Sequence, residues 1–184
     1  MWIVKQDFKK INEYESMYGR LLILCQKYEK TCKEIVKWLN LAVAIDERKF
    51  GFLSDEHMSY VEKLDKLFLA GSINALDKNE KLNISDEDIN LLHGGRESRN
   101  WIIHSSANLV FDKIYSSRDS SIDAELHDLI YEHLKNIARA DFIVSKWSFE
   151  FQEKEPSNFS DIDNYTKMIS DWVLSDFKEE EDFR

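Results

Sequence analysis

The chain has 184 residues, of which 43% are hydrophobic and 33% charged, and its formal net charge is −10. This apolar content can form a sizeable core, which excludes a wholly disordered chain, and five Gly with one Pro are too few for a turn-rich β-sandwich. The acidic balance argues against a protein that coats nucleic acid by neutralising phosphates, but it leaves room for a small local basic site.

The segment from about Asp7 to Arg48 shows the most regular helical pattern. Ile11 and Tyr18 begin a seven-residue repeat that continues through Cys25, Cys32 and Leu39, and a second apolar position fills each interval. Other apolar residues widen this stripe beyond a two-stranded seam, so we expect one long helix that packs into a bundle. The two cysteines lie too far apart along such a helix to bond, and we expect reduced thiols in a cytoplasmic protein.

A second helix is expected from about Ser54, ending near Gly71 or Leu76, and the polar stretch 77–83 is expected to be a loop. Ser85, with Asp88 three residues later, is typical of the N-cap of a third helix. Six apolar residues are expected on one side of that helix: Ile89, Leu92, Ile103, Ala107, Val110 and Ile114.

The pair Gly94–Gly95 falls inside the third expected helix. Glycine weakens a helix by about 1 kcal/mol, so the pair indicates either close approach of another backbone or a bend. A fourth long helix follows the Ser/Asp-rich turn at 116–121 and carries an apolar stripe from Leu126 to Phe151 that includes His133. We interpret His133 as a core histidine with a satisfied hydrogen bond.

After the only proline, Pro156, the pair Ser160 and Asp163 indicates the start of a shorter C-terminal helix. No apolar run approaches the roughly 20 residues of a membrane span, and the first ten residues lack the order of a secretory signal. We therefore predict an all-α, up-and-down bundle of four long helices plus a C-terminal helix. Residues 1–152 would form the bundle, and residues 153–184 a linker and a helix with an acidic tail, packed on the bundle or exchanged with it.

The chemistry-bearing residues gather in the stretch HGGRESRNWIIHSS, residues 93–106. Arg96, Asn100 and His104 are four residues apart in turn, so they share one side of a helix and prolong the expected core-facing stripe. Buried guanidinium, amide and imidazole groups need partners, which leaves two interpretations: a structural polar network, or a wet groove that binds a ligand. The long side chain of Arg99 could reach the same groove and meet His104 at one phosphate.

The spacing Arg99-Asn100-x3-His104 resembles the Arg-polar-x3-His form of the Arg-x4–6-His signature of the HEPN superfamily. The resemblance covers the helical layout of about residues 7–150, and identical motif residues only at these three positions. It implies a helical dimer whose two motifs face each other across a composite cleft, and often a metal-independent endoribonuclease that leaves a 2′,3′-cyclic phosphate. Position 106 is Ser106, where many toxin-type members have a tyrosine.

The leading hypothesis from the sequence is a ribonuclease of the toxin or defence type, without metal or cofactor, regulated by an antitoxin or another protein. In this hypothesis His104 is a general acid/base, Arg99 stabilises charge on the phosphate, and Asn100 is an orienting residue that positions the imidazole or the phosphate. Arg96, His93 and Trp101 are candidate RNA-binding residues. The alternative is a catalytically inactive helical dimer that binds a protein or a nucleic acid.

Overall fold

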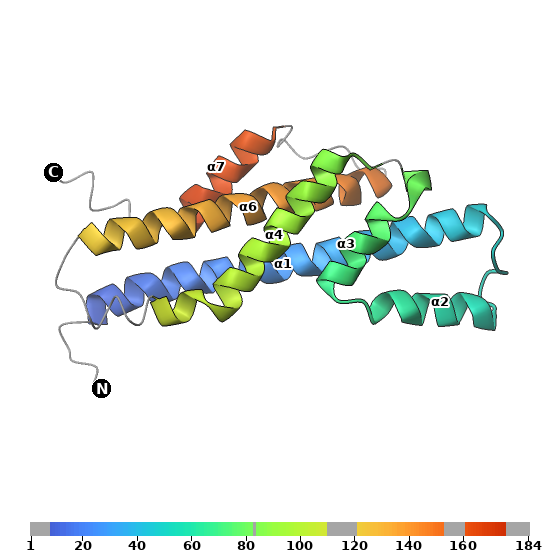
Figure 1. Cartoon of the computed structure of the whole chain (residues 1–184), viewed down its shortest axis with the longest axis horizontal. Helices are drawn as coiled ribbons and strands as arrows, with labels where there is room; N and C mark the ends of the chain where they lie inside the picture. Colours follow the sequence, from blue (N-terminus) through green and yellow to red (C-terminus); the bar gives the residue numbers. More distant parts are fainter. Residues whose placement is uncertain (1–7, 83, 110–120, 153–160, 176–184) are drawn as a thin grey trace.

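The computed structural model describes residues 8–82, 84–109, 121–152 and 161–175. Every regular element in these ranges is a helix, and they contain no β-strand. The predicted all-α class is therefore confirmed. Figure 1 shows two long helices side by side, with the shorter helices packed around them.

Helix α1 (Phe8–Asp46) corresponds to the first predicted helix. The side chains of Cys25 and Cys32 are completely buried in the core, and both thiols are free. Leu21, Tyr28 and Ile35 are buried on the same stripe, which faces the helices that cover α1. The seven-residue apolar pattern thus predicted both the helix and its buried side.

The second predicted helix is instead two helices, α2 (Asp55–Asp65) and α3 (Leu69–Asp77). Ser54, where the helix was expected to begin, is the N-cap of α2, since its hydroxyl accepts a hydrogen bond from the backbone N–H of His57 at 3.2 Å. On one straight helix Leu64 and Ile73, nine residues apart, would point about 180° apart. The break between the helices allows both side chains to be buried, which explains why one helix was the wrong prediction.

After the short 3₁₀ helix η2 (Glu80–Leu82), helix α4 (Asp86–His104) begins at the predicted cap. The hydroxyl of Ser85 accepts a hydrogen bond from the backbone N–H of Asp88 at 3.1 Å. Helix α4 continues through the glycine pair without a break. A Cβ on Gly95 would lie 2.4 Å from the Cβ of Ala140 on α6, whereas one on Gly94 would meet nothing within 4 Å. Of the two explanations, close approach of another helix and a bend, the first is therefore correct, and it applies to Gly95 but not to Gly94.

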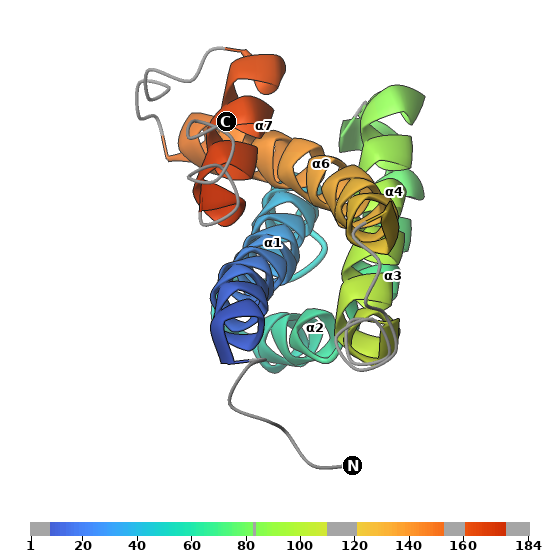
Figure 2. The same ribbon diagram turned by 90° about the vertical axis from the view of Figure 1, so that its left-hand side faces the viewer.

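Helix α6 (Ser121–Phe151) matches the fourth predicted helix. It lies alongside α1 and runs in the same direction, as both views show (Figures 1 and 2). A bundle that alternated strictly up and down through four long helices would place the first and fourth helices in opposite directions. The difference arises between them, where the chain forms two short helices and then α4, which crosses α6.

Helix α7 (Ile162–Val173) packs on α6 and α1. Its N-cap is Asp161, whose carboxylate accepts a hydrogen bond from the N–H of Asp163, while the predicted cap at 160 lies outside the described residues. The backbone carbonyl of Val173 accepts a hydrogen bond from Arg20 Nε on α1 at 3.1 Å. The C-terminal helix thus shares the core of the same chain.

A buried polar cluster joins these three helices. Asp141 on α6 has no exposed surface and contacts Lys27 on α1 with a distance of 2.5 Å between Oδ2 and Nζ. The hydroxyl of Tyr165 on α7 donates a hydrogen bond to the same carboxylate oxygen. Lys27 also donates to Ser145 Oγ at 3.0 Å. A buried carboxylate needs such partners, so the cluster fixes how α7 lies on the other two helices.

Candidate functional site

Helix α4 carries all six residues that the sequence singled out, and its burial pattern decides where they point. Its buried residues are Ile89, Leu92, Gly95, Ser98 and Ile102. Asn100 and His104 are exposed and Arg96 is half-buried, so their shared stripe lies outside the core. The expectation that these polar groups prolong the core-facing stripe is therefore wrong. Ile89 and Leu92 are buried as predicted, whereas near the end of α4 Ile102 rather than Ile103 is fully buried.

Arg99 is the most firmly held of the motif side chains. One terminal nitrogen donates a hydrogen bond to Glu29 Oε2 on α1 at 2.5 Å, and the other donates to Asn100 Oδ1 at 3.0 Å. The same glutamate lies 4.0 Å from Lys33, one turn further along α1. About three quarters of the Arg99 side chain is covered, its exposed fraction being 23%. This ion pair is partly shielded from water and fixes the guanidinium beside Asn100.

His104 is the last residue of α4 and its side chain is exposed. It lies five residues after Arg99, which corresponds to about 140° of rotation and about 7.5 Å along a helix. Arg99 meanwhile extends toward α1, where Glu29 holds it. Within one chain, therefore, the structure does not bring the guanidinium and the imidazole together, contrary to the expected convergence.

Two further predicted residues present unused nitrogen atoms. Arg96 donates one hydrogen bond to the exposed Glu97 at 3.0 Å, while its Nε is buried and has no hydrogen-bond partner. His93, one turn earlier, has a buried Nδ1 that also has no partner. Arg99 Nε is likewise buried and has no hydrogen-bond partner. Buried polar atoms without partners are costly, and because these nitrogens have almost no accessible surface, a ligand can reach them only after the surrounding side chains move.

Trp101 faces α6 and is separated from the other motif residues. Its ring stacks on the ring of His133, with 4.1 Å between centroids and 20° between planes. His133 Nδ1 lies 3.1 Å from Ser98 Oγ, and the amide of Asn136 donates to the same hydroxyl at 3.2 Å. Burial lowers the pKa of His133, and the nearby Glu132 opposes this shift. The predicted hydrogen bond of His133 is confirmed, although the ring is only half-buried.

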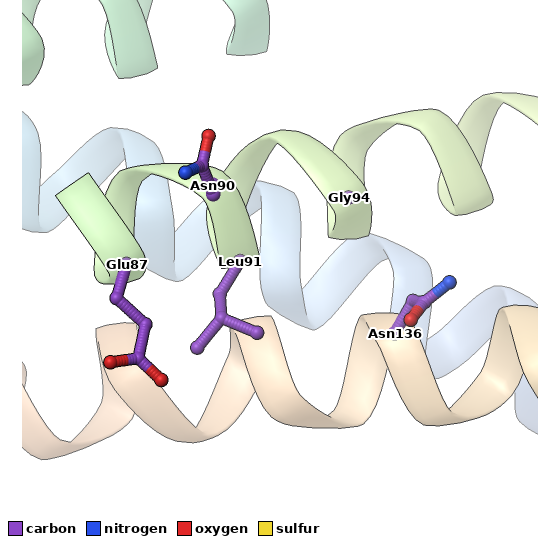
Figure 3. A pocket seen from close by; sticks show the side chains of 5 residues that line it. All are labelled: Glu87, Asn90, Leu91, Gly94 and Asn136. Carbon is purple, nitrogen blue, oxygen red and sulfur yellow. The ribbon is translucent and has the colours of Figure 1, made fainter.

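A hollow of about 470 Å³ lies between α4 and α6 next to this cluster. It is lined by Glu87, Asn90, Leu91 and Gly94 from α4 and by Asn136 from α6 (Figure 3). It was not predicted from the sequence, because its lining residues form no recognisable motif. The one sequence feature that could have indicated the hollow was Gly94, because a glycine on a helix surface leaves open space where a side chain would lie.

No group of three or more His, Cys, Asp or Glu side chains in the described ranges is arranged to hold a metal ion. No described helix is long and apolar enough to cross a membrane.

No protein-family model, curated protein or solved structure matches the chain. The resemblance to the HEPN superfamily consequently depends on Arg99, Asn100 and His104 and on the helical layout alone.

Proposed function

We propose that the chain is a metal-independent endoribonuclease of the toxin or defence type, and that its active site is completed by a second copy of the chain. The observation that carries the proposal is the state of the motif on α4: Glu29 and Asn100 fix the Arg99 guanidinium, and Asn100 and His104 are exposed where a partner can reach them. Arg96, whose guanidinium is partly exposed and pairs with the exposed Glu97, adds a donor group for a phosphate.

The proposed reaction is an in-line attack of the ribose 2′-oxygen on the adjacent phosphorus. The 2′-hydroxyl proton passes to the imidazole of His104, the bond from phosphorus to the 5′-oxygen breaks, and the resulting imidazolium returns a proton to the leaving oxygen. His104 is the proton-transfer group and Arg99 stabilises the charge on the phosphoryl oxygens. The products are a 2′,3′-cyclic phosphate and a 5′-hydroxyl. These two side chains supply proton transfer and charge stabilisation, so the proposed reaction requires no metal.

The divergence of Arg99 and His104 within one chain supports a composite site. A two-fold axis near α4 would bring His104 of one protomer toward Arg99 of its partner, since an interface of this kind pairs each residue with a different residue of the other copy. The exposed position of His104 at the end of α4 leaves it accessible to such a partner.

The test incubates purified protein with mixed RNA in EDTA and maps the cut ends. Wild type should cleave and leave cyclic-phosphate ends, and His104→Ala should lower the rate by about 10²–10⁴-fold. Because His104 is exposed, this variant should change the free energy of unfolding by less than about 0.5 kcal/mol. His127→Ala on α6 is the matched control and should cleave normally. Cleavage that requires added metal, or that survives in His104→Ala, contradicts the proposal.

A mixing experiment tests whether the site is composite. Arg99→Ala and His104→Ala are each expected to be inactive alone. After the two variants are unfolded and refolded together, mixed dimers contain one site with both native side chains and should regain part of the wild-type activity. Absence of recovery, with mixed dimers demonstrated by mass, would place each site within one chain.

The alternative function is an inactive helical dimer that binds a protein or a nucleic acid. The specific observation in its favour is that Glu29 already neutralises Arg99, so the motif can be read as a structural ion pair between α1 and α4. Under this alternative no RNA is cleaved by the folded dimer, and Glu29→Gln lowers stability without affecting any RNA-dependent signal.

A further inference from the structure

The hollow between α4 and α6 lies on a different side of α4 from the motif. Gly94, which lines it, is six residues before Asn100 and therefore about 120° away around the helix. Three of its five lining side chains carry hydrogen-bond acceptors, namely Glu87, Asn90 and Asn136, and none of the five is cationic. The hollow therefore has its own chemistry, independent of the proposed ribonuclease site.

Glu87 supplies the only charge among the lining residues. Its side chain extends from the first turn of α4 toward α6 in Figure 3. Glu87 is exposed, and neither an ion pair nor a side-chain hydrogen bond engages its carboxylate within the parts of the chain that the structure describes. It is available to a ligand that can donate hydrogen bonds and carries positive charge.

Asn136 on the opposite wall has a fixed orientation. Its Nδ2 donates to Ser98 Oγ at 3.2 Å, and that hydroxyl lies 3.1 Å from His133 Nδ1. One consistent direction runs from the amide to the hydroxyl and from the hydroxyl proton to the ring nitrogen. The amide Oδ1 then remains as a positioned acceptor. The lowered pKa of His133 keeps its ring uncharged at neutral pH, so this wall adds no positive charge.

We infer that this hollow receives an ammonium or guanidinium group carried on an aliphatic chain. The carboxylate of Glu87 pairs with the cation at one end of the hollow, and Asn136 Oδ1, at the other end in Figure 3, accepts a hydrogen bond from a second polar group of the ligand. Leu91 and the open surface above Gly94 accommodate the methylene groups, which bury well against apolar atoms while the charged end stays polar. Such a group comes either from a Lys or Arg side chain of a partner protein or from a free polyamine.

The test measures binding of agmatine, spermidine and N-acetyl-arginine amide by calorimetry, with n-butanol as an uncharged control. Glu87→Gln should weaken agmatine binding by about two- to fivefold, because Glu87 is exposed and an exposed ion pair is partly screened by water. Gly94→Leu should also weaken it by filling the hollow, and the open space at Gly94 Cβ allows the fold to be retained. Glu15→Gln is the matched control, since it removes the same charge from an exposed position on α1.

The possible outcomes distinguish a partner side chain from a free polyamine, and they also show which results would overturn the inference. Saturable binding of N-acetyl-arginine amide supports a partner side chain, and saturable binding of spermidine alone supports a free polyamine. Equal weakening by Glu87→Gln and Glu15→Gln would show only non-specific attraction to an acidic protein and would overturn the inference. Absence of saturable binding of all three cations to folded wild type would overturn it as well. Neither result bears on RNA cleavage.

Discussion

Replacing Gly95 by Ala tests whether α4 and α6 pack as closely as the structure indicates. The new Cβ would lie 2.4 Å from Ala140 Cβ, and 3.2 Å and 3.3 Å from two carbons of the Tyr28 ring. Carbon atoms pack best at about 3.5–4.0 Å, so α4 must move by more than about 1 Å. Ala140 cannot relieve the contact by rotation, because its Cβ is fixed to the backbone of α6.

The expected cost follows from two opposing effects. Overpacking a well-filled core costs about 1–3 kcal/mol and occasionally more, and the Tyr28 hydroxyl, which donates to the carbonyl of Leu92 at 2.6 Å, must shift too. The better helix propensity of alanine offsets less than about 1 kcal/mol. We expect Gly95→Ala to lower the free energy of unfolding by about 2 kcal/mol and Tm by about 4–8 °C.

Gly94→Ala provides the matched control, because its Cβ meets no atom within 4 Å. It should raise stability by about 0.5–1 kcal/mol through helix propensity alone. Both variants are measured by urea unfolding and thermal melting followed by circular dichroism. Ala140→Gly in the Gly95→Ala background removes the opposing Cβ and should recover part of the loss. If Gly95→Ala is as stable as Gly94→Ala, the close packing of α4 on α6 is refuted.

Three further predictions concern buried groups. Asp141→Ala should lower the free energy of unfolding in urea by about 1–3 kcal/mol, because it removes the acceptor of the Tyr165 hydroxyl while Lys27 stays half-exposed. Glu150→Ala, in an exposed pair, should change it by less than about 0.5 kcal/mol, and equal effects would contradict the cluster. Burial raises the pKa of the thiols of Cys25 and Cys32 to about 12. Both thiols should therefore react with a thiol reagent at neutral pH only after unfolding, and rapid reaction of the native protein would contradict their burial. The pKa of His133 is lowered in the folded protein, so the unfolded chain protonates His133 first as the pH falls. The free energy of unfolding should therefore decline from about pH 7 downward, and it should decline less in His133→Gln. Identical pH profiles of the two proteins would exclude this contribution.

Long amphipathic helices were predictable because their apolar residues repeat with the period of the helix. The seven-residue pattern around Cys25 and Cys32 marked α1 within two residues at each end, and the cap at Ser85 marked the start of α4. The break between α2 and α3 was not predictable in this way. Every residue there is compatible with a helix, and the break follows from the need to bury both Leu64 and Ile73, which depends on where the neighbouring helices lie.

The glycine pair shows a similar limit within the candidate site. The glycine pair in a helical segment predicted either close packing or a bend at Gly94–Gly95. The sequence could not distinguish the two glycines, because their roles depend on which helix packs against each of them. Gly95 is required by Ala140 on a helix that follows later in the chain, while Gly94 opens the hollow beside Asn136. The same residue type therefore serves tight packing at one position and an open surface at the next.

The positions of Arg99 and His104 depend on a partner that is distant in the sequence. Spacing alone placed Arg99 and His104 within reach of one phosphate, because a long side chain was assumed to be free to turn toward the imidazole. Glu29, which is seventy residues earlier in the chain, holds it toward α1 instead. No local pattern could reveal that partner. If the two groups act on one phosphate, a second chain must supply one of them, so the oligomeric state of the protein determines whether the motif can be catalytic at all.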